Sequence, residues 1–305
     1  MTKFGFFAGT IFLTVLSCPS VHALPLQTFV STSGSDANNC GLATPCRFFS
    51  GAIPKTAAGG VIVALESGPY GAANVDKALT LMAAPGVHAA MGTAVIGDVV
   101  SINAGASDVV VLRNLYVSRL GSSGNGIQVN SVGTLHIEGC TITRFTGGSS
   151  FGINIAAGSP QVFINDTFIR DNGAGIFARG AMAIDHCRIE NNNSTGFGYG
   201  VGVSSGAKVS IRDSIVSGHS LGLSLQFSSG AELDVDNCLV FNNAAAGISI
   251  DSVSSAGTVR VSNSTVFNNG IGFKNSIGVF QSRGNNTVRG NGNNTQGTIT
   301  LISGT

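Results

Sequence analysis

The sequence predicts an all-β fold: a right-handed single-stranded parallel β-helix solenoid with three strands per coil and a short N-terminal capping helix. The first observation is a six-residue phrase that recurs every 20 to 27 residues, because self-similarity at such a period marks a solenoid. Each copy reads apolar, two turn-type residues, a small residue, any residue, apolar. The copies begin at Leu112, Ile137, Ile164, Ile184, Ile211, Val235 and Val261.

The second observation is that positions around the phrase keep one residue class from copy to copy. Apolar residues stand two before its start, at its start and five after it, and a period of two places them on the inner face of strands. The second turn position favours residues that tolerate a left-handed backbone, so we expect a sharp bend there. This column reads Asn114, Gly139, Asp166, His186, Asp213, Asn237 and Asn263.

The third observation is a further strand after each phrase, with the pattern Gly, apolar, any residue, apolar. β-Branched residues dominate and no helical side fits, which disfavours a leucine-rich repeat. The hexapeptide period of left-handed β-helices is absent. We divide the chain into a signal peptide at 1–23, an N-terminal cap at 24–60, a parallel β-helix at 61–290 and a C-terminal tail or cap at 291–305.

The first 23 residues have the features of a secretory signal peptide. Lys3 gives a basic start, an apolar stretch too short to span a bilayer follows, and Ala23 ends a small-x-small cleavage site. We therefore expect a secreted protein, extracellular or periplasmic. As an alternative, the residues before Cys18 loosely resemble a lipobox, which would make Cys18 a lipid anchor. No other run is predicted to be a transmembrane segment.

The cap is predicted to contain one short amphipathic helix that covers the open end of the solenoid. Thr44 would cap this helix, Pro45 would be its first residue and Pro54 would end it. Cys40 and Cys46 lie close together in the same loop. In an oxidising compartment we expect them to form a disulfide.

Three further cysteines, Cys140, Cys187 and Cys238, occupy the small inward position of alternate coils. With strands about 4.8 Å apart, their Cα atoms are on the order of 9.6 Å apart, beyond the roughly 7 Å limit for a disulfide. The same spacing argues against zinc, which binds sulfur at about 2.3 Å. We expect three free, buried thiols, and we predict neither a metal nor a cofactor.

The composition argues against nucleic acid as a partner. Charged residues make up 10% of the chain and the formal net charge is +1, whereas an average globular protein is roughly 25% charged. Phosphate binding needs clustered Lys and Arg. Gly is frequent, at 43 residues, which suits many tight turns and little helix.

The segment that leads into the repeats resembles the entry segment of secreted bacterial β-helix proteins. It reads FVSTSGSDANNC at 29–40, then Pro-Cys-Arg at 45–47 and Gly-Gly-Val-Ile-Val at 59–63. Together with the repeats, it makes residues 27–290 similar to right-handed parallel β-helix proteins of the pectin-lyase-like superfamily. That group includes pectate lyases, polygalacturonases, alginate epimerases, phage tailspikes and many members of no known activity. The resemblance therefore implies a fold and not one chemistry.

Enzymes of this superfamily usually carry their sites on the outer face of the third strand and on the loops beside it. Asp251 is the one carboxylate expected there, whereas glycoside hydrolysis normally needs a pair and a calcium-dependent lyase needs several acidic oxygens. The polygalacturonase signatures Asn-Thr-Asp, Asp-Asp, Gly-His-Gly and Arg-Ile-Lys are also missing.

What remains is a candidate polysaccharide-binding groove on one side of the solenoid. Cations near Tyr would grip an acidic sugar, and an Arg would serve as the base of a metal-free lyase. Solvated positive residues on a polar face are the simpler interpretation. The groove comprises Arg119, Arg144, Arg179, Tyr199, Gln226, Asp251 and Lys274.

A second candidate surface is an outward apolar column on the second strand of successive coils. Large apolar residues in adjacent coils form a patch that rarely stays exposed without a reason. Another protein chain would cover it, or the chain's own tail, in which residues 298–302 alternate as a strand. The interaction patch comprises Phe168, Ile215, Leu239, Phe241 and Phe267.

These observations support three functional hypotheses. The favoured one is a secreted or surface β-helix protein with a structural or binding role and no recognisable catalytic set. The alternative is a polysaccharide-active enzyme, resembling a metal-free uronate lyase. The third is an adhesin-like or tailspike-like assembly module, although the signal peptide argues against a phage origin. The expected partner is a polysaccharide or another protein chain.

Overall fold

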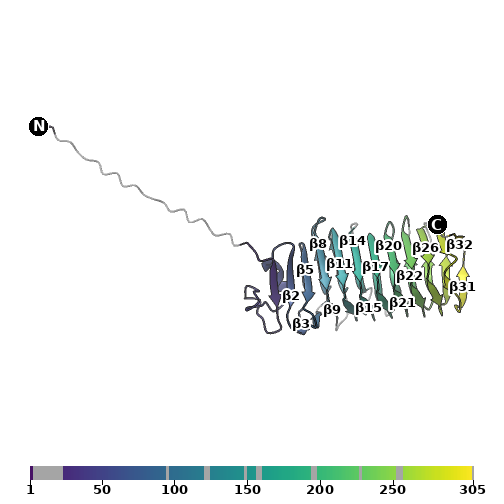
Figure 1. Cartoon of the computed structure of the whole chain (residues 1–305), viewed down its shortest axis with the longest axis horizontal. Coiled ribbons are helices and arrows are strands. Elements are labelled where there is room, and N and C mark those ends of the chain that lie inside the picture. The colour runs from purple at the N-terminus through teal and green to yellow at the C-terminus, as the bar shows by residue number, and fades with distance from the viewer. Residues whose placement is uncertain are drawn as a thin grey trace.

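The computed structural model describes residues 1–2, 23–93, 96–119, 124–147, 150–155, 160–193, 198–226, 229–251 and 257–303. Its coils are stacked along one long axis, in order from the N-terminal to the C-terminal end of the solenoid (Figure 1). Most of the predicted signal peptide, including Cys18, lies outside the described residues.

Each coil gives one strand to each of three parallel sheets, which confirms the predicted all-β solenoid with three strands per coil. Sheet 1 consists of β1 Gln27–Val30, β2 Gly60–Ala64, β5 Leu79–Ala83, β8 Val109–Arg113, β11 Thr134–Glu138, β14 Gln161–Asn165, β17 Ala181–Asp185, β20 Lys208–Arg212, β23 Glu232–Asp236, β26 Gly257–Ser262, β29 Gly278–Arg283 and β32 Thr300–Ile302. Sheet 2 consists of β3 Gly68–Pro69, β6 Ala89–Met91, β9 Leu115–Ser118, β12 Thr141–Thr143, β15 Phe168–Arg170, β18 Arg188–Glu190, β21 Ile215–Ser217, β24 Leu239–Phe241, β27 Thr265–Phe267 and β30 Thr287–Val288. Sheet 3 consists of β4 Ala73–Val75, β7 Val100–Asn103, β10 Ile127–Ser131, β13 Phe151–Ile155, β16 Ala174–Ala178, β19 Tyr199–Val203, β22 Leu221–Leu225, β25 Ala246–Ile250, β28 Ile271–Asn275 and β31 Asn293–Gln296.

The core lies between the three sheets and is built from the predicted apolar columns. In the coil that starts with β11, for example, Leu135, Ile137 and Ile142 are fully buried. The bend between a sheet 1 strand and the next sheet 2 strand, called the first corner, falls on the predicted turn column. All seven residues of that column have a left-handed backbone, with φ from 48° at Asn237 to 60° at Gly139.

The bend between sheet 2 and sheet 3, called the second corner, contains a feature that the sequence analysis missed. A left-handed residue such as Asn191 or Asn242 makes the turn, and the next side chain points inward and is buried. These inward side chains form a ladder of hydrogen bonds from coil to coil, as the amides of Asn172 and Asn192 do at 2.8 Å. The ladder contains Asn172, Asn192, His219, Asn243, Asn269 and Asn291.

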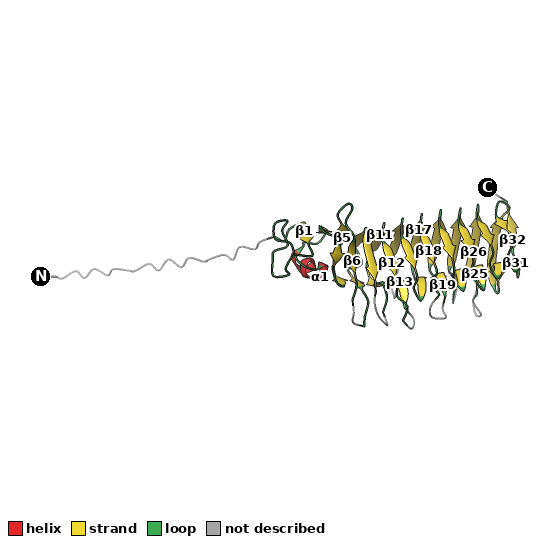
Figure 2. Ribbon diagram, turned by 90° about the horizontal axis from the view of Figure 1, so that it is seen from below, coloured by secondary structure: helices red, strands yellow, loops and turns green. Residues whose placement is uncertain are grey.

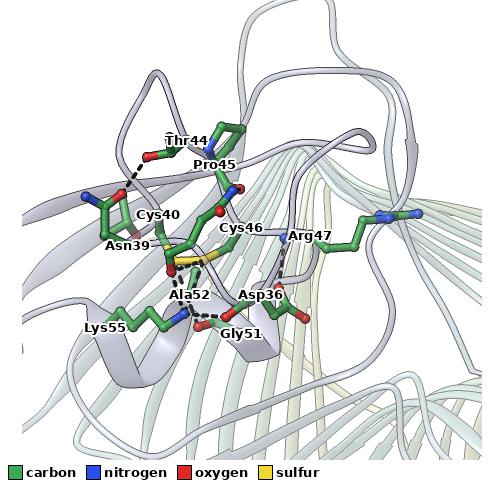
Figure 3. Close-up of a disulfide and its surroundings, with 12 residues drawn as sticks. Asp36, Asn39, Cys40, Thr44, Pro45, Cys46, Arg47, Gly51, Ala52 and Lys55 are labelled. Carbon is green, nitrogen blue, oxygen red and sulfur yellow. Dashed lines mark hydrogen bonds between the residues drawn. A yellow bond between two sulfur atoms is a disulfide. The ribbon is translucent and has the colours of Figure 1, made fainter.

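The cap helix begins later than predicted. α1 (Phe49–Ala52) starts four residues after Pro45. Thr44 does not cap it, because its hydroxyl donates to the side chain of Asn39, 2.6 Å away. Instead, the carboxylate of Asp36 accepts the backbone N–H groups of the two residues before α1 (Figure 3). The N-cap residue of α1 makes no side-chain cap hydrogen bond, and Asp36 holds the two residues before the helix from a position 11 to 12 residues upstream.

The remainder of the cap agrees with the prediction in its disulfide and differs at Pro54. Cys40 and Cys46 are bonded and buried, with Cα atoms 4.6 Å apart. Pro54 does not end the helical segment, because it lies inside the 3-10 helix η1 (Ile53–Lys55), where a missing N–H is tolerated. Figure 2 shows the helical segment at the N-terminal end of the stack.

The C-terminal tail extends the last coil. β32 pairs in parallel with β29 in sheet 1. The interaction patch lies on sheet 2, so of the two positions expected for the tail, the end of the solenoid is the one it takes.

Candidate functional site

Five of the seven predicted groove residues lie on the outer side of sheet 3, and two lie at the second corner. Tyr199 begins β19, Lys274 lies in β28, and the other three follow the ends of three further sheet 3 strands. Those three are Arg179 after β16, Gln226 after β22 and Asp251 after β25. The columns of the repeat therefore bring residues about 95 positions apart in the chain onto one face, since neighbouring coils are about 4.8 Å apart.

The two arginines at the second corner differ in exposure. Arg119 is only 2% exposed, and its guanidinium donates a hydrogen bond to the carbonyl of Gly97. It therefore does not face the predicted groove, and this part of the expectation is corrected. Arg144 is exposed, with a left-handed backbone (φ 71°), and it stands beside sheet 3 where the chain turns toward β13.

An aromatic cluster occupies the middle of the sheet 3 outer face. The rings of Phe151, Phe177 and Tyr199 lie 5.7 to 6.2 Å apart between centroids. Gly202 makes room for it, because a Cβ there would lie 2.6 Å from the Tyr199 ring. Burial raises the pKa of the Tyr199 hydroxyl, so this side chain packs as a neutral ring rather than acting as a base.

Arg179 is the exposed cation of this cluster. Its guanidinium carbon lies 4.6 Å from the centre of the Phe177 ring, a cation–π contact that holds the side chain against the face. The sequence contains the signal for this pair, because the two residues are outward neighbours on one strand.

A network of amides covers the sheet 3 face on the N-terminal side of the aromatic cluster. The side chain of Gln128 is its centre: Asn125 and Asn154 donate to its oxygen at 2.8 and 2.9 Å, and its own amide donates to Asn130 at 3.0 Å. Asn130 in turn donates to Asn103 on the preceding coil at 2.9 Å. Asn103 and Asn130 are exposed, so the network presents amides to the surface on successive coils.

A hydroxyl and ion-pair network covers the same face on the C-terminal side. The hydroxyl of Ser249 donates to Ser224 at 2.9 Å, and the amide of Gln226 donates to Ser224 at 2.7 Å. Asp251 forms an ion pair with Lys274 on the next coil. The positive charge of this lysine is therefore neutralised locally.

The residues predicted for the interaction patch lie on strands of sheet 2. Phe168 and Phe267 are 40% and 36% exposed, whereas Ile215, Leu239 and Phe241 are half-buried. Phe241 and Phe267 stack with centroids 5.2 Å apart.

The internal cysteines are free and buried, as predicted. Burial raises the pKa of Cys140 and Cys187 to about 11 and that of Cys238 to about 12. Thiols that stay protonated at neutral pH are poor nucleophiles and poor metal ligands.

One group of side chains brings metal-ligand atoms together at the first corner. Oxygen and nitrogen atoms of Asp185, His186 and Asp213 lie within 4.8 Å of one another. Protein groups already engage these carboxylates: Arg212 pairs with Asp185 at 2.6 Å, and the amide of Asn237 donates to Asp213 at 2.5 Å. A cation would have to displace the guanidinium, so this group is better explained as an ion-pair network.

The comparison with protein families identifies the fold. Residues 97–230 match the family model described as a right handed beta helix region. The chain has the right-handed parallel β-helix fold. This β-helix superimposes on the crystal structure of pectate lyase Pel9A with a TM-score of 0.67 and 16% identity, covering 94% of this chain and 80% of the lyase.

A second solved structure is also similar to this chain in fold, at a lower TM-score. The GH136 lacto-N-biosidase from Eubacterium ramulus aligns with a TM-score of 0.57 and 10% identity, covering 91% of this chain and 67% of that enzyme. At identities this low, the structural similarity establishes a shared fold, related to that of polysaccharide-active enzymes. It does not establish a shared chemistry, which depends on the side chains. The search of curated proteins found no match. Among the described residues, no helix is long and apolar enough to cross a membrane.

Proposed function

We propose that this protein is a secreted, non-catalytic β-helix that binds an acidic polysaccharide along the outer face of sheet 3. The observation that carries the proposal is the succession of amide, cationic and hydroxyl side chains from β7 to β28 on one face. Coils recur about every 4.8 Å. Such a face offers a polymer of repeating units a repeating set of donors and acceptors.

The charges on this face favour an acidic polymer. From β10 to β28, the charged side chains at described outward positions are Arg179, Asp251 and Lys274. An incoming carboxylate would reach Arg179, which is exposed and lies over the Phe177 ring, with Arg144 as a second exposed cation at the adjoining corner. Hydrogen bonds between guanidinium and carboxylate are among the stronger ones in proteins.

The disulfide supports secretion. Bonds such as that between Cys40 and Cys46 persist in oxidising compartments outside the cytoplasm. The signal peptide expected from the sequence would deliver the chain there. A polysaccharide of a cell wall or matrix is then within reach.

Calorimetric titration of the protein with oligogalacturonate tests this proposal. Replacing Arg179→Ala should weaken binding about tenfold or more, because a hydrogen bond to a charged group contributes about 1.5 to 3 kcal/mol. The control Arg113→Ala removes the same charge from an exposed site on sheet 1 and should leave the affinity unchanged. A protein that binds no oligouronate, or an Arg179→Ala variant that binds as tightly as the unmodified chain, contradicts the proposal.

A polysaccharide lyase is the second candidate function, and the extent of the fold similarity to pectate lyase Pel9A favours it. A lyase would cleave the same oligogalacturonate by β-elimination and release an unsaturated product that absorbs ultraviolet light. Recording absorbance during the titration separates the two candidates. Binding without a rise in absorbance supports the non-catalytic role, whereas a rise that is lost in Arg179→Ala supports the lyase.

A further inference from the structure

Sheet 1 carries a concave surface, on a different side of the solenoid from the sheet 3 face discussed above. A depression of about 390 Å³ lies across strands β14 to β23. Its floor is made by Ala181, Ala183 and Ser210, with Phe163 at one end and Glu232 and Asp234 at the other. We call it the sheet 1 trough.

The trough exists because β17 has alanine at two successive outward positions. The strands are in register, so that Phe163, Ala183, Ser210 and Asp234 follow one another on adjacent coils. Small side chains on two of these coils leave a gap between larger neighbours. Three coil steps separate Phe163 from Asp234, which gives the trough a length of about 14 Å.

The Phe163 end of the trough is a fixed aromatic wall. The ring of His136, on the preceding coil, stacks on Phe163 with centroids 5.0 Å apart and planes 13° apart. Because His136 lies one coil before Phe163 and Ala183 lies one coil after it, the other face of the phenyl ring is turned toward the trough. An aromatic face of this kind packs well against the C–H groups of a flat ligand.

The opposite end of the trough is polar and electrically neutral. Glu232 pairs with Lys208 at 2.5 Å and with Arg260 at 3.0 Å, and Arg260 also pairs with Asp234 at 3.2 Å. Two cations thus meet two carboxylates. The hydrogen bond from Lys208 lowers the pKa of the Glu232 carboxyl, so Glu232 stays charged at neutral pH. The ion pair of Asp234 uses Oδ1. The Asp234 carboxylate at this end and the Ser210 hydroxyl in the floor are hydrogen-bonding groups that line the trough.

We propose that the sheet 1 trough binds an uncharged oligosaccharide of two or three pyranose rings. An anionic sugar is disfavoured, because both cations at this end are already paired with carboxylates. A neutral sugar suits the trough: its rings lie over Ala181 and Ala183, C–H groups at one end contact the face of Phe163, and its hydroxyls bond to Ser210 and Asp234. A pyranose unit advances about as far as one coil of this solenoid, so the length of about 14 Å holds roughly two or three units.

This site goes beyond the proposed function, since it lies on another sheet and selects the opposite charge class. The two sites together would let one β-helix hold a neutral glycan on one side and an acidic glycan on another. Each site can fail without the other, because no residue belongs to both.

Calorimetric titrations with cellotriose, chitotriose and β-1,4-galactotriose test the proposal, with trigalacturonate as the charged comparison. At least one neutral trisaccharide should bind the unmodified protein. Phe163→Ala should weaken that binding by three- to tenfold, and Ala183→Trp should abolish it by filling the trough. The control Thr80→Trp adds the same side chain in the same outward column, three coils before Phe163, and should bind normally.

The outcomes separate the two proposals. Arg179→Ala should leave neutral trisaccharide binding unchanged, and Ala183→Trp should leave trigalacturonate binding unchanged. Equal melting temperatures of the variants show that the fold is kept. Failure of all three neutral trisaccharides to bind, or undiminished binding by Ala183→Trp, overturns the trough as a glycan site whatever trigalacturonate does.

Discussion

At the first corner the inward side chains alternate between thiol and hydroxyl, whereas at the second corner they form a nearly continuous run of amides. In the first corner, the hydroxyl of Ser214 accepts the backbone N–H of Cys187 at 3.0 Å and donates to its own coil at 2.6 Å. In the second, the side chain of Asn243 accepts from the preceding coil and donates to the next. Both corners satisfy buried backbone groups. In the first corner, hydroxyl hydrogen bonds join coils in pairs, and only weak thiol hydrogen bonds, such as Cys187 to the Ile164 carbonyl at 3.5 Å, link one pair to the preceding coil. In the second corner, amide hydrogen bonds run along the stack.

This difference determines how much a substitution at each corner should lower the free energy of unfolding. A paired contact can be lost with local cost, while a break in a buried chain of hydrogen bonds leaves polar groups without partners on both sides. The comparison therefore predicts that the second corner is the more sensitive of the two. Both corners support the outer faces, since they fix the coil register on which each surface depends.

The largest effect is expected for Asn243→Leu in the second corner. The change removes the acceptor of the His219 backbone N–H (3.1 Å) and the donor to Asn269 (2.9 Å), so the free energy of unfolding should fall by about 3 to 4 kcal/mol. The matched change in the first corner is Cys187→Ser, which places a hydroxyl where alternate coils already have one. It should cost about 1 kcal/mol or less. Urea denaturation of both variants measures this, and equal losses would show that the ladder is not a cooperative network.

A slightly smaller effect is expected from acid at His219, the one imidazole in the ladder. Its Nδ1 contacts the Asn243 oxygen at 3.1 Å, and its Nε2 faces the Asn192 amide nitrogen at 3.2 Å. An amide N–H₂ group donates, so Nε2 must be the unprotonated acceptor and the ring is neutral. Burial lowers the pKa of His219 from 6.5 to about 4.

The sign of the pH dependence follows from that shift. The unfolded chain binds a proton near pH 6.5 and the folded chain only near pH 4, so the contribution of the neutral ring is complete above pH 6.5 and is lost as pH falls toward 4. The loss is about 3 kcal/mol. In His219→Asn the ladder would carry an amide at this coil, as it does in the neighbouring coils. Between pH 6.5 and pH 4, the unfolding free energy of this variant should fall by about 3 kcal/mol less than that of the unmodified chain. A decline identical to that of the unmodified chain would rule out His219 as its source.

The first corner was predictable from the sequence and the second was not recognised, although both recur with the repeat. The turn column and the cysteine column lie inside the repeated phrase, so each coil restates their role. The amide ladder lies eight residues after each phrase start. This position holds Asn in most coils, as at Asn172 and Asn243, but it holds a His in one coil between them and Phe145 in the coil before Asn172. The mixed residue types hide the column, while their shared role follows only from the inward direction of the side chains.

The outer faces were predictable in part, for a related reason. Alternation along a strand predicts that Arg179 points outward, but it does not predict that Arg119, just after β9, is buried with its guanidinium bonded to the carbonyl of Gly97. The start of the cap helix was misplaced because Thr44 bonds to Asn39 instead of capping a helix, and the residues just before α1 are held by Asp36, which is remote in sequence. The sheet 1 trough depends on which large residues flank the alanines of β17 in neighbouring coils, which requires the register of four strands at once.

The most direct test of the account is a crystal structure of the protein with bound oligogalacturonate. If sheet 3 binds the acidic polymer, density for the sugar should lie along its outer face, between the amides around Gln128 and the ion pair of Lys274, with a uronate carboxylate against Arg179. Oligogalacturonate bound on sheet 1 or sheet 2 instead would contradict the proposed function. So would a crystal soaked at a saturating concentration of the sugar that shows no sugar density on sheet 3.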